Sequence, residues 1–340
     1  MWRAGAIGLG LSLFAGLAAA ESRRVLGFDE LRGWASDQHA EALGVFRNSC
    51  MDLKGQDWQA LCRLASDAPD ARRFFEMFFR PVLIEDGQPP LITGYFEPEL
   101  QGARRPSSRF RNPVYGVPPG HVEGRQGLTR AEIEGGNALA GKGLEIAWVE
   151  DTVGLFYMQV QGSGRIRLSD GGILRLGYAG KNGHPYRSPG VELVNRGIYQ
   201  PHQVSAQVVR NWFRRNPDEG RELLMASPAY VYFREIDGLA EDTGPKGAMN
   251  RPITAKRSIA VDPAYVPLGA PVWLEKGGRE PVRRLVVAQD TGGAIKGAQR
   301  ADLFLGSGEA AGRAAAKLKD RGRLIVFLPI GQALSMADEF

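Results

Sequence analysis

Hydrophobic positions divide the chain into a helical first part and a strand-rich remainder. From residue 28 to about residue 80, apolar side chains such as Leu43 and Phe46 recur every three or four positions, which is typical of amphipathic helices. After Pro81 the apolar runs become shorter and are separated by glycine-rich and proline-rich turns. The pattern predicts a mainly β protein with N-terminal helices.

Short apolar or alternating runs bounded by turn residues predict the individual strands. We expect strands at 82–84, 91–96, 156–163, 229–235, 257–262, 271–275, 284–289 and 323–328, and a hairpin over 165–178. Helical periodicity or a capping box predicts further helices at 129–139, 205–216, 218–225 and 307–319. Residues 101–127 show no periodicity, and we expect a long loop or a domain crossing there.

Polar side chains alternate with apolar ones in the segment 156–163. A strand would place Tyr157, Gln159, Gln161 and Ser163 together on one face. An ordinary solvated strand face is one interpretation. Three hydrogen-bonding side chains that run into Gly162-Ser163-Gly164 favour a sugar-binding surface.

The first twenty residues have the features of a secretory signal. A positive charge at Arg3 precedes a short apolar run and a small-residue site at Ala18-Ala19-Ala20, so we expect cleavage after residue 20. An uncleaved anchor is the alternative interpretation. No cysteine lies near the cleavage site, so lipid attachment is not expected there.

Composition excludes several classes of protein. A net charge of +5, spread along the chain, is too small and too scattered for a nucleic-acid-binding surface. The four histidines show no ligand spacing, so neither a metal nor a cofactor is expected. Cys50 and Cys62 lie close together in the exported part, which favours a disulfide between two short helices. Two free buried thiols are the alternative.

Three aspartates are the remaining candidates for chemistry. We expect Asp262, Asp290 and Asp302 each to lie at the end of a strand, near glycine. A turn aspartate that caps backbone N–H groups is the ordinary interpretation of such a residue. The apolar flanks of Asp290 and Asp302 indicate partial burial, which raises a carboxyl pKa and suits a general acid.

The same segments carry a resemblance to a known family. They are Gly-Tyr-Phe-Glu-Pro at 94–98, Gln-Val-Gln-Gly-Ser-Gly at 159–164, Gly-Tyr-Ala-Gly-Lys-Asn-Gly at 177–183, Ser-Pro-Ala-Tyr-Val-Tyr-Phe at 227–233, and the three aspartate segments. In this order, from about residue 80 to 330, the chain resembles the membrane-bound lytic murein transglycosylase A family with its C-terminal three-aspartate (3D) domain.

The resemblance implies a double-psi β-barrel domain formed by both chain ends, with a second β-barrel-like domain inserted. The implied division is signal 1–20, barrel 21–100, inserted substrate domain 101–232 and barrel again 233–340. It also implies a lytic transglycosylase that cleaves between N-acetylmuramic acid and N-acetylglucosamine and leaves 1,6-anhydro ends.

The resemblance also implies the site residues. Asp302 matches the catalytic residue, with Asp290 assisting it and Asp262 in a supporting position. For substrate binding we expect Tyr95, Gln161, Ser163, Tyr178, Lys181, Gly292 and Gly293.

Two alternatives stay open from the sequence. One is a hydrolytic glycosidase on the same barrel, with Asp290 and Asp302 as its two carboxylates; the other is a non-catalytic cell-wall binding protein. In each case the expected partner is the peptidoglycan glycan strand. The protein is expected to be a monomer in the periplasm of a Gram-negative bacterium, with outer-membrane association and complexes that synthesise the cell wall as further candidates.

Overall fold

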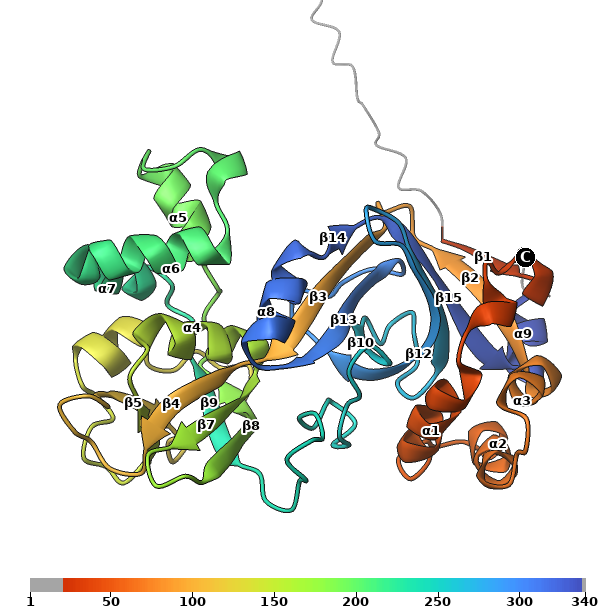
Figure 1. The fold of residues 1–340 in the computed structure, drawn as a ribbon, viewed down its shortest axis with the longest axis horizontal. Helices are drawn as coiled ribbons and strands as arrows, with labels where there is room; N and C mark the ends of the chain where they lie inside the picture. The colour runs from red at the N-terminus through yellow and green to blue at the C-terminus, as the bar shows by residue number, and fades with distance from the viewer. Residues whose placement is uncertain (1–20, 338–340) are drawn as a thin grey trace, which may run out of the picture.

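Two β-sheets form the body of the protein, which is described here from a computed structural model over residues 21–337 (Figure 1). The nine-stranded sheet comes from the two ends of the chain, and its strand order is β1-β2-β15-β11-β12-β10-β13-β3-β14. Its strands are β1 (Ser22–Val25), β2 (Phe79–Glu85), β3 (Leu91–Glu97), β10 (Ser258–Val261), β11 (Pro271–Lys276), β12 (Val282–Thr291), β13 (Arg300–Ser307), β14 (Lys319–Asp320) and β15 (Gly322–Pro329).

The six-stranded sheet comes from the middle of the chain, in the order β5-β6-β4-β7-β8-β9. Its strands are β4 (Glu99–Ala103), β5 (Asn112–Tyr115), β6 (Glu145–Val149), β7 (Ser163–Leu168), β8 (Ile173–Lys181) and β9 (Val231–Glu235). The chain therefore passes from the first sheet to the second between β3 and β4, and returns between β9 and β10. The structure is mainly β with some helices, as the hydrophobic pattern predicts.

Helices cover one end of the nine-stranded sheet. They are α1 (His39–Ser49), α2 (Gln56–Ser66), α3 (Ala71–Phe78) and α9 (Ile330–Ala337), preceded by the 3-10 turns η1 (Phe28–Glu30) and η2 (Trp34–Ser36), while α8 (Gly308–Lys317) follows β13. The aromatic side chains of the first helices are core residues: Phe46 of α1 packs against Phe75 of α3 and Phe79 of β2, and all three are fully buried. The regular spacing of these aromatic residues in the sequence therefore reflects core packing and does not mark a ligand site.

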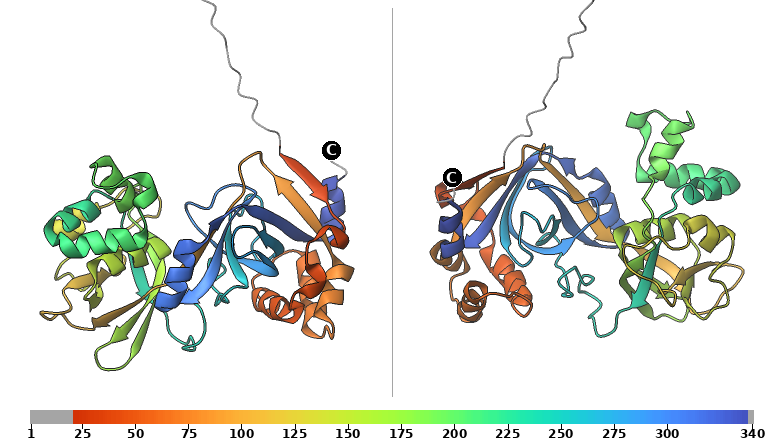
Figure 2. Two further views of the ribbon diagram at one scale, coloured as in Figure 1. Left: turned by 45° about the horizontal axis from the view of Figure 1, so that its top comes forward. Right: turned by 180° about the vertical axis from the view of Figure 1, so that it is seen from behind.

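A second group of helices belongs to the six-stranded sheet. They are η3 (Ala131–Gly135), α4 (Thr152–Gln161), α5 (Pro189–Asn195), η4 (Pro201–Gln203), α6 (Ala206–Arg215) and α7 (Pro217–Met225). Helices α5 to α7 project away from the sheet in Figure 1 and in the right view of Figure 2. They enclose a small core of their own around Leu193, Val209, Trp212 and Leu223.

Several predicted elements are confirmed and others are wrong. The hairpin of β7 and β8, helices α6, α7 and α8, and the strands at 91–96, 271–275, 284–289 and 323–328 lie close to where the pattern predicts them. The segment 101–127 is not a simple loop, because it contains the end of β4 and all of β5. The strand β13 was not predicted, so Asp302 is the third residue of a strand rather than a residue at a strand end.

The predicted strand at 156–163 is wrong. Residues 152–161 form α4, which Asp151 caps by accepting a 2.8 Å hydrogen bond from the N–H of Gly154, and Gly162 ends it at a φ of 77°. Side chains on almost every side of α4 are buried, and this conceals the helical period. The apolar alternation in this segment therefore does not reflect a strand face.

No helix within residues 21–337 is long and apolar enough to span a membrane. The predicted signal at 1–20 lies outside the described residues.

Candidate active site

Three adjacent strands bring Asp290 and Asp302 to one face of the nine-stranded sheet. Strand β10 lies between β12 and β13, and its Ala260 is the register partner of both Asp290 and Asp302. Residues opposite one another on neighbouring strands project from the same face. Because Ala260 has only a methyl side chain, little stands between the two carboxyl groups.

Both carboxylate oxygens of Asp290 accept hydrogen bonds. Its Oδ2 accepts from the hydroxyl of Tyr95 at 2.9 Å, and its Oδ1 accepts from the backbone N–H groups of Ala248 and Thr291, each at 2.9 Å. Burial raises the pKa of the Asp290 carboxyl, these hydrogen bonds oppose that shift, and the neighbouring Asp302 adds to it. Burial, together with Asp290, also holds the pKa of Tyr95 well above its usual value, so its hydroxyl stays a donor.

The contact between Tyr95 and Asp290 shows that the sheet is strongly curled. Tyr95 lies on β3, which β13 and β10 separate from β12. On a flat sheet these strands would be about 14 Å apart, too far for the two side chains to meet. The curvature of the sheet therefore brings Tyr95 to Asp290. Figure 1 shows these strands bent around a common interior.

Asp302 has fewer partners than Asp290. Its Oδ1 accepts from Nη1 of Arg300 at 2.8 Å, and its Oδ2 accepts no hydrogen bond from any residue in 21–337. The side chain is 20% exposed, so one oxygen is reachable. Burial raises the pKa of the Asp302 carboxyl, and this outweighs the opposing charge of Arg300. Arg300 itself is fixed by donating to the carbonyl oxygens of Leu91 and Ala301.

Asp262 holds a loop instead of joining the other two aspartates. It directly follows β10, is buried, and accepts hydrogen bonds from the N–H groups of Gly297 at 3.0 Å and Ala264 at 3.3 Å. Burial acts to raise its pKa, but these hydrogen bonds and Lys296 hold the pKa below its usual value. Asp262 is therefore an ionised anchor for the loop between β12 and β13.

A cleft of about 960 Å³ adjoins Asp290. One wall comes from the six-stranded sheet, α4 and the loops attached to them, and the other from the loop at 245–250 and from residues 290–294 at and after the end of β12. Six residues predicted to bind substrate line it: Gln161, Ser163, Tyr178, Lys181, Gly292 and Gly293. Tyr95 and Asp302 do not line this cleft; Tyr95 instead contacts Asp290, and its ring packs on Phe304.

Polar residues at the end of α4 have structural partners. Gln159 is buried and accepts from Arg130, so it does not belong to an exposed polar face. Gln161 lines the cleft while its Oε1 accepts from the backbone N–H of Phe96 at 3.1 Å. Tyr178, 43% exposed, donates its hydroxyl hydrogen to Glu123.

The sequence did not reveal the loop at 245–250. A Cβ at Gly247 would come within 2.6 Å of the carbonyl oxygen of Gln289 and 3.3 Å of Cβ of Asp290, so this glycine allows the loop to lie against the strand end. The glycine-rich composition around it was the available signal, but a glycine pattern alone does not identify the strand that the loop contacts.

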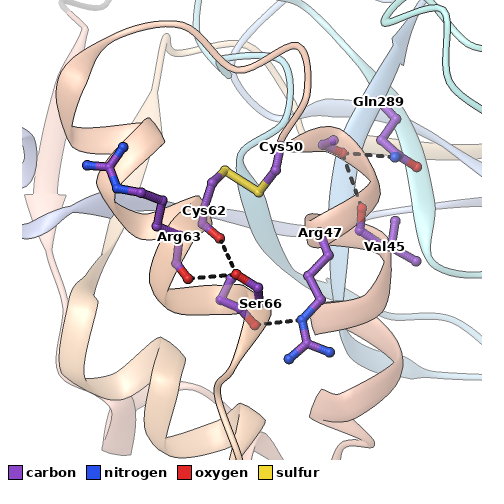
Figure 3. Close-up of a disulfide and its surroundings, with 9 residues drawn as sticks. Val45, Arg47, Cys50, Cys62, Arg63, Ser66 and Gln289 are labelled. Atoms are coloured by element: carbon purple, nitrogen blue, oxygen red, sulfur yellow. Dashed lines mark hydrogen bonds between the residues drawn. A yellow bond between two sulfur atoms is a disulfide. The ribbon is translucent and has the colours of Figure 1, made fainter.

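The disulfide region supports the strand that carries Asp290 (Figure 3). Cys50, directly after α1, is bonded to Cys62 of α2, with their Cα atoms 5.5 Å apart. Next to Cys50, Ser49 accepts a 2.9 Å hydrogen bond from the buried side chain of Gln289, the residue before Asp290. The helical region therefore helps to position the end of β12.

Comparison with known proteins agrees with this architecture. Residues 91–234 match the family model of the MltA specific insert domain, and residues 257–328 match that of the 3D domain. The fold is shared with the crystal structure of MltA from Neisseria gonorrhoeae (TM-score 0.81, 33% identity, 92% of this chain and 93% of that one). It is also shared with Escherichia coli MltA with bound chitohexaose (TM-score 0.72, 31% identity, 88% of this chain and 90% of that one).

The class is thus a two-sheet protein with an MltA insert and a 3D domain. The membrane-bound lytic murein transglycosylase A of Escherichia coli K12 is 34% identical over 84% of this chain and 80% of its own length. That of Vibrio cholerae is 36% identical over 69% of this chain, a match that spans 64% of the relative. The chain belongs to the membrane-bound lytic murein transglycosylase A family.

Proposed function

We propose that this protein is a lytic transglycosylase of the bacterial envelope. It cleaves the β-1,4 bond between N-acetylmuramic acid and N-acetylglucosamine in peptidoglycan and forms 1,6-anhydromuramic acid ends. The observation that carries the proposal is the difference between the two aspartates: Asp302 keeps one oxygen free and has a raised pKa, whereas Asp290 is fully engaged by donors.

Asp302 acts as the general acid. A raised pKa keeps a larger share of Asp302 protonated near neutral pH, which a proton donor needs. It donates its proton to the glycosidic oxygen, and the bond from that oxygen to C1 of the muramic acid breaks with development of an oxocarbenium-like state.

The same residue then acts as the base. The 6-hydroxyl oxygen of the muramic acid attacks C1, its proton passes to the Asp302 carboxylate, and the starting state of the enzyme is restored. Because this hydroxyl belongs to the same sugar, proximity replaces the second carboxylate that hydrolases use, and no water is consumed. Arg300 stabilises the ionised Asp302 between the two steps.

Asp290 and Tyr95 support the site. Oδ1 of Asp290 holds the loop at 245–250 by accepting from the N–H of Ala248. The hydroxyl of Tyr95 donates to Oδ2 of Asp290 and fixes it. With both oxygens occupied, Asp290 is poorly suited to activate a water, which argues against the hydrolytic alternative. The partly exposed acid of raised pKa argues against a purely binding protein.

The remaining assignments extend the proposal. The curled nine-stranded sheet corresponds to a double-psi β-barrel domain, and the inserted substrate domain, expected at 101–232, corresponds to the sheet of β4 to β9. Glycan strands occupy the cleft between them, in contact with Gln161, Ser163, Tyr178, Lys181 and the backbone at Gly292 and Gly293. The expected compartment is the periplasm, in contact with the cell wall.

Replacement of Asp302 tests the catalytic assignment. We predict that Asp302→Asn abolishes the release of soluble fragments from purified sacculi, because an amide donates no proton at neutral pH. Binding to sacculi and the thermal unfolding midpoint stay close to those of the wild type. A variant that still solubilises sacculi at more than a trace of the wild-type rate contradicts the assignment.

If Asp290 supports Asp302 without donating the proton, Asp290→Asn should reduce activity only in part. The amide oxygen still accepts one set of hydrogen bonds but the amide nitrogen cannot accept from Tyr95, so we predict a partial loss of activity, about ten- to a hundredfold. Initial rates of fragment release measure it. A wild-type rate would mean that Asp290 only caps its turn.

A further inference from the structure

Positive side chains predominate along the cleft. Lys181, Arg234 and Lys246 line it, and none of the three forms an ion pair with a residue of the described part of the chain. Arg130 also lines the cleft, but it is paired with Glu134. Asp290 is the single carboxylate among the described lining residues.

The three cations come from both sides of the cleft. Lys181 is the last residue of β8, and Arg234 lies on the adjacent strand β9. Lys246 belongs to the opposite loop, two residues before Ala248, whose N–H is bonded to Asp290. The positive charges therefore extend from the inserted sheet to the edge of the candidate active site.

Two acidic side chains lie close to these cations. Glu123, beside Lys181, accepts from the hydroxyl of Tyr178 and from the backbone N–H of Lys181. Glu235, next to Arg234 in sequence, makes a two-pronged ion pair with Arg104. Glu123 forms no ion pair with Lys181 but interacts with its charge and offsets part of it, whereas Glu235 is paired with Arg104, so Arg234 and Lys246 keep their charges.

Such an arrangement is complementary to an anion. Like charges around a concave surface repel one another and focus a positive potential into it, which a bound anion relieves. An ammonium or guanidinium group forms its strongest hydrogen bonds with ionised acceptors. A neutral sugar chain offers no such acceptor.

We infer that Lys181, Arg234 and Lys246 form a carboxylate-binding wall, which makes the cleft selective for acidic glycans over neutral ones. This inference rests on the proposed function only in that the cleft receives a glycan. Peptidoglycan offers two sources of carboxylate. One is the stem peptide, and the other is the lactyl group of muramic acid, which is free where the stem peptide has been removed.

Binding measurements on a full-length Asp302→Asn background test the inference without turnover. Three probes of equal sugar number are compared by calorimetry at low salt: a neutral chitooligosaccharide, a glycan strand freed of stem peptides by an amidase, and a strand that retains them. We expect an acidic strand to bind about tenfold more tightly than the neutral one. Tighter binding of the peptide-free strand alone assigns the lactyl carboxylate, and tighter binding of the peptide-bearing strand alone assigns the stem. Tighter binding of both strands shows that the wall accepts either carboxylate.

Removal of the charges identifies the wall. The combined variant Lys181→Gln, Arg234→Gln, Lys246→Gln is expected to reduce the acidic-to-neutral affinity ratio to about one, and Lys181→Gln alone to lower it roughly twofold. The matched control is Lys142→Gln, an exposed lysine that does not line the cleft, which should leave the ratio unchanged. Added salt should reduce the wild-type ratio in the same direction.

Two results overturn the inference. One is a wild-type ratio of about one at low salt. The other is a folded triple variant, or a folded Lys181→Gln protein, that keeps the full wild-type ratio. Because no step of the assay requires catalysis, either result leaves the proposed transglycosylase activity untouched, and loss of that activity leaves the ratio measurable.

Discussion

At the scale of single residues, Asp302 and Arg300 form the most informative pair. A general acid needs a raised pKa, yet Arg300 donates to Asp302 at 2.8 Å and acts to lower that pKa. Burial prevails, so the carboxyl is protonated more readily than an exposed aspartate. Arg300 then stabilises the carboxylate that remains after proton donation. It therefore affects Asp302 both as the acid and as the base of the proposed reaction.

The pH dependence of Arg300→Met follows from these opposing effects. Activity requires protonated Asp302 and should fall as the pH rises through its pKa. A positive neighbour favours the ionised form, so its removal raises the pKa further and moves this fall in kcat/KM to higher pH. Arg313→Met, which breaks an exposed ion pair on α8, should leave the profile in place. A shift to lower pH would show that Arg300 does not act on Asp302 in this way.

The sequence was sufficient to select the three aspartates but not to distinguish their surroundings. Apolar flanks indicated the burial of Asp290 and Asp302. The free oxygen of Asp302 and the donors around Asp290 depend on Tyr95, Ala248 and a curled sheet, and residues this far apart in sequence give no local signal of their contact. Arg300 was missed because the strand β13 was not predicted.

At the scale of elements, the two connections between the sheets meet at a buried carboxylate. Glu97, at the end of β3, is fully buried and accepts from Arg165 of β7, Arg175 of β8 and Ser307 of β13. The two arginines also donate to the carbonyl oxygens of residues 240, 241 and 243 on the returning connection. This cluster joins both sheets and both crossings, and so fixes one side of the cleft.

Because Glu97 holds this cluster together, loss of its charge should strongly destabilise the fold. Glu97→Gln leaves two buried arginines without their counter-ion, and we predict a decrease of about 3–5 kcal/mol in the free energy of unfolding. Glu99→Gln, which breaks the largely exposed pair with Arg167, should cost less than about 1 kcal/mol. Urea unfolding of both variants measures the difference. Equal effects would show that the cluster does not hold the two sheets together.

Helices with a single buried face were predicted well, whereas the largely buried helix α4 was not. Helices α6 and α8 each bury one face, and their period was visible in the sequence. Helix α4 is buried on most sides, so its apolar alternation resembled a strand. Its caps, Asp151 and Gly162, were the better signal, because cap geometry depends on neighbouring residues alone.

At the scale of the whole molecule, the chain builds its cleft from two sheets that are separate in sequence. The nine-stranded sheet carries the aspartates, and the opposite wall is lined by the six-stranded sheet together with α4 and the loops attached to that sheet. The discontinuous arrangement was expected from the family resemblance, whereas hydrophobic periodicity alone could not indicate that the first and last segments share a sheet. We therefore expect a single catalytic acid, Asp302, and a glycan bound between the two walls of the cleft.

The mass of the released fragments tests this account most directly. Purified protein is incubated with sacculi, and the soluble fragments are analysed by mass spectrometry. The account predicts muramic acid ends that are one water lighter than hydrolysis products and resist borohydride reduction, as 1,6-anhydro ends do. Reducible ends of full mass would show that water is the acceptor, and would contradict the one-acid mechanism assigned to Asp302.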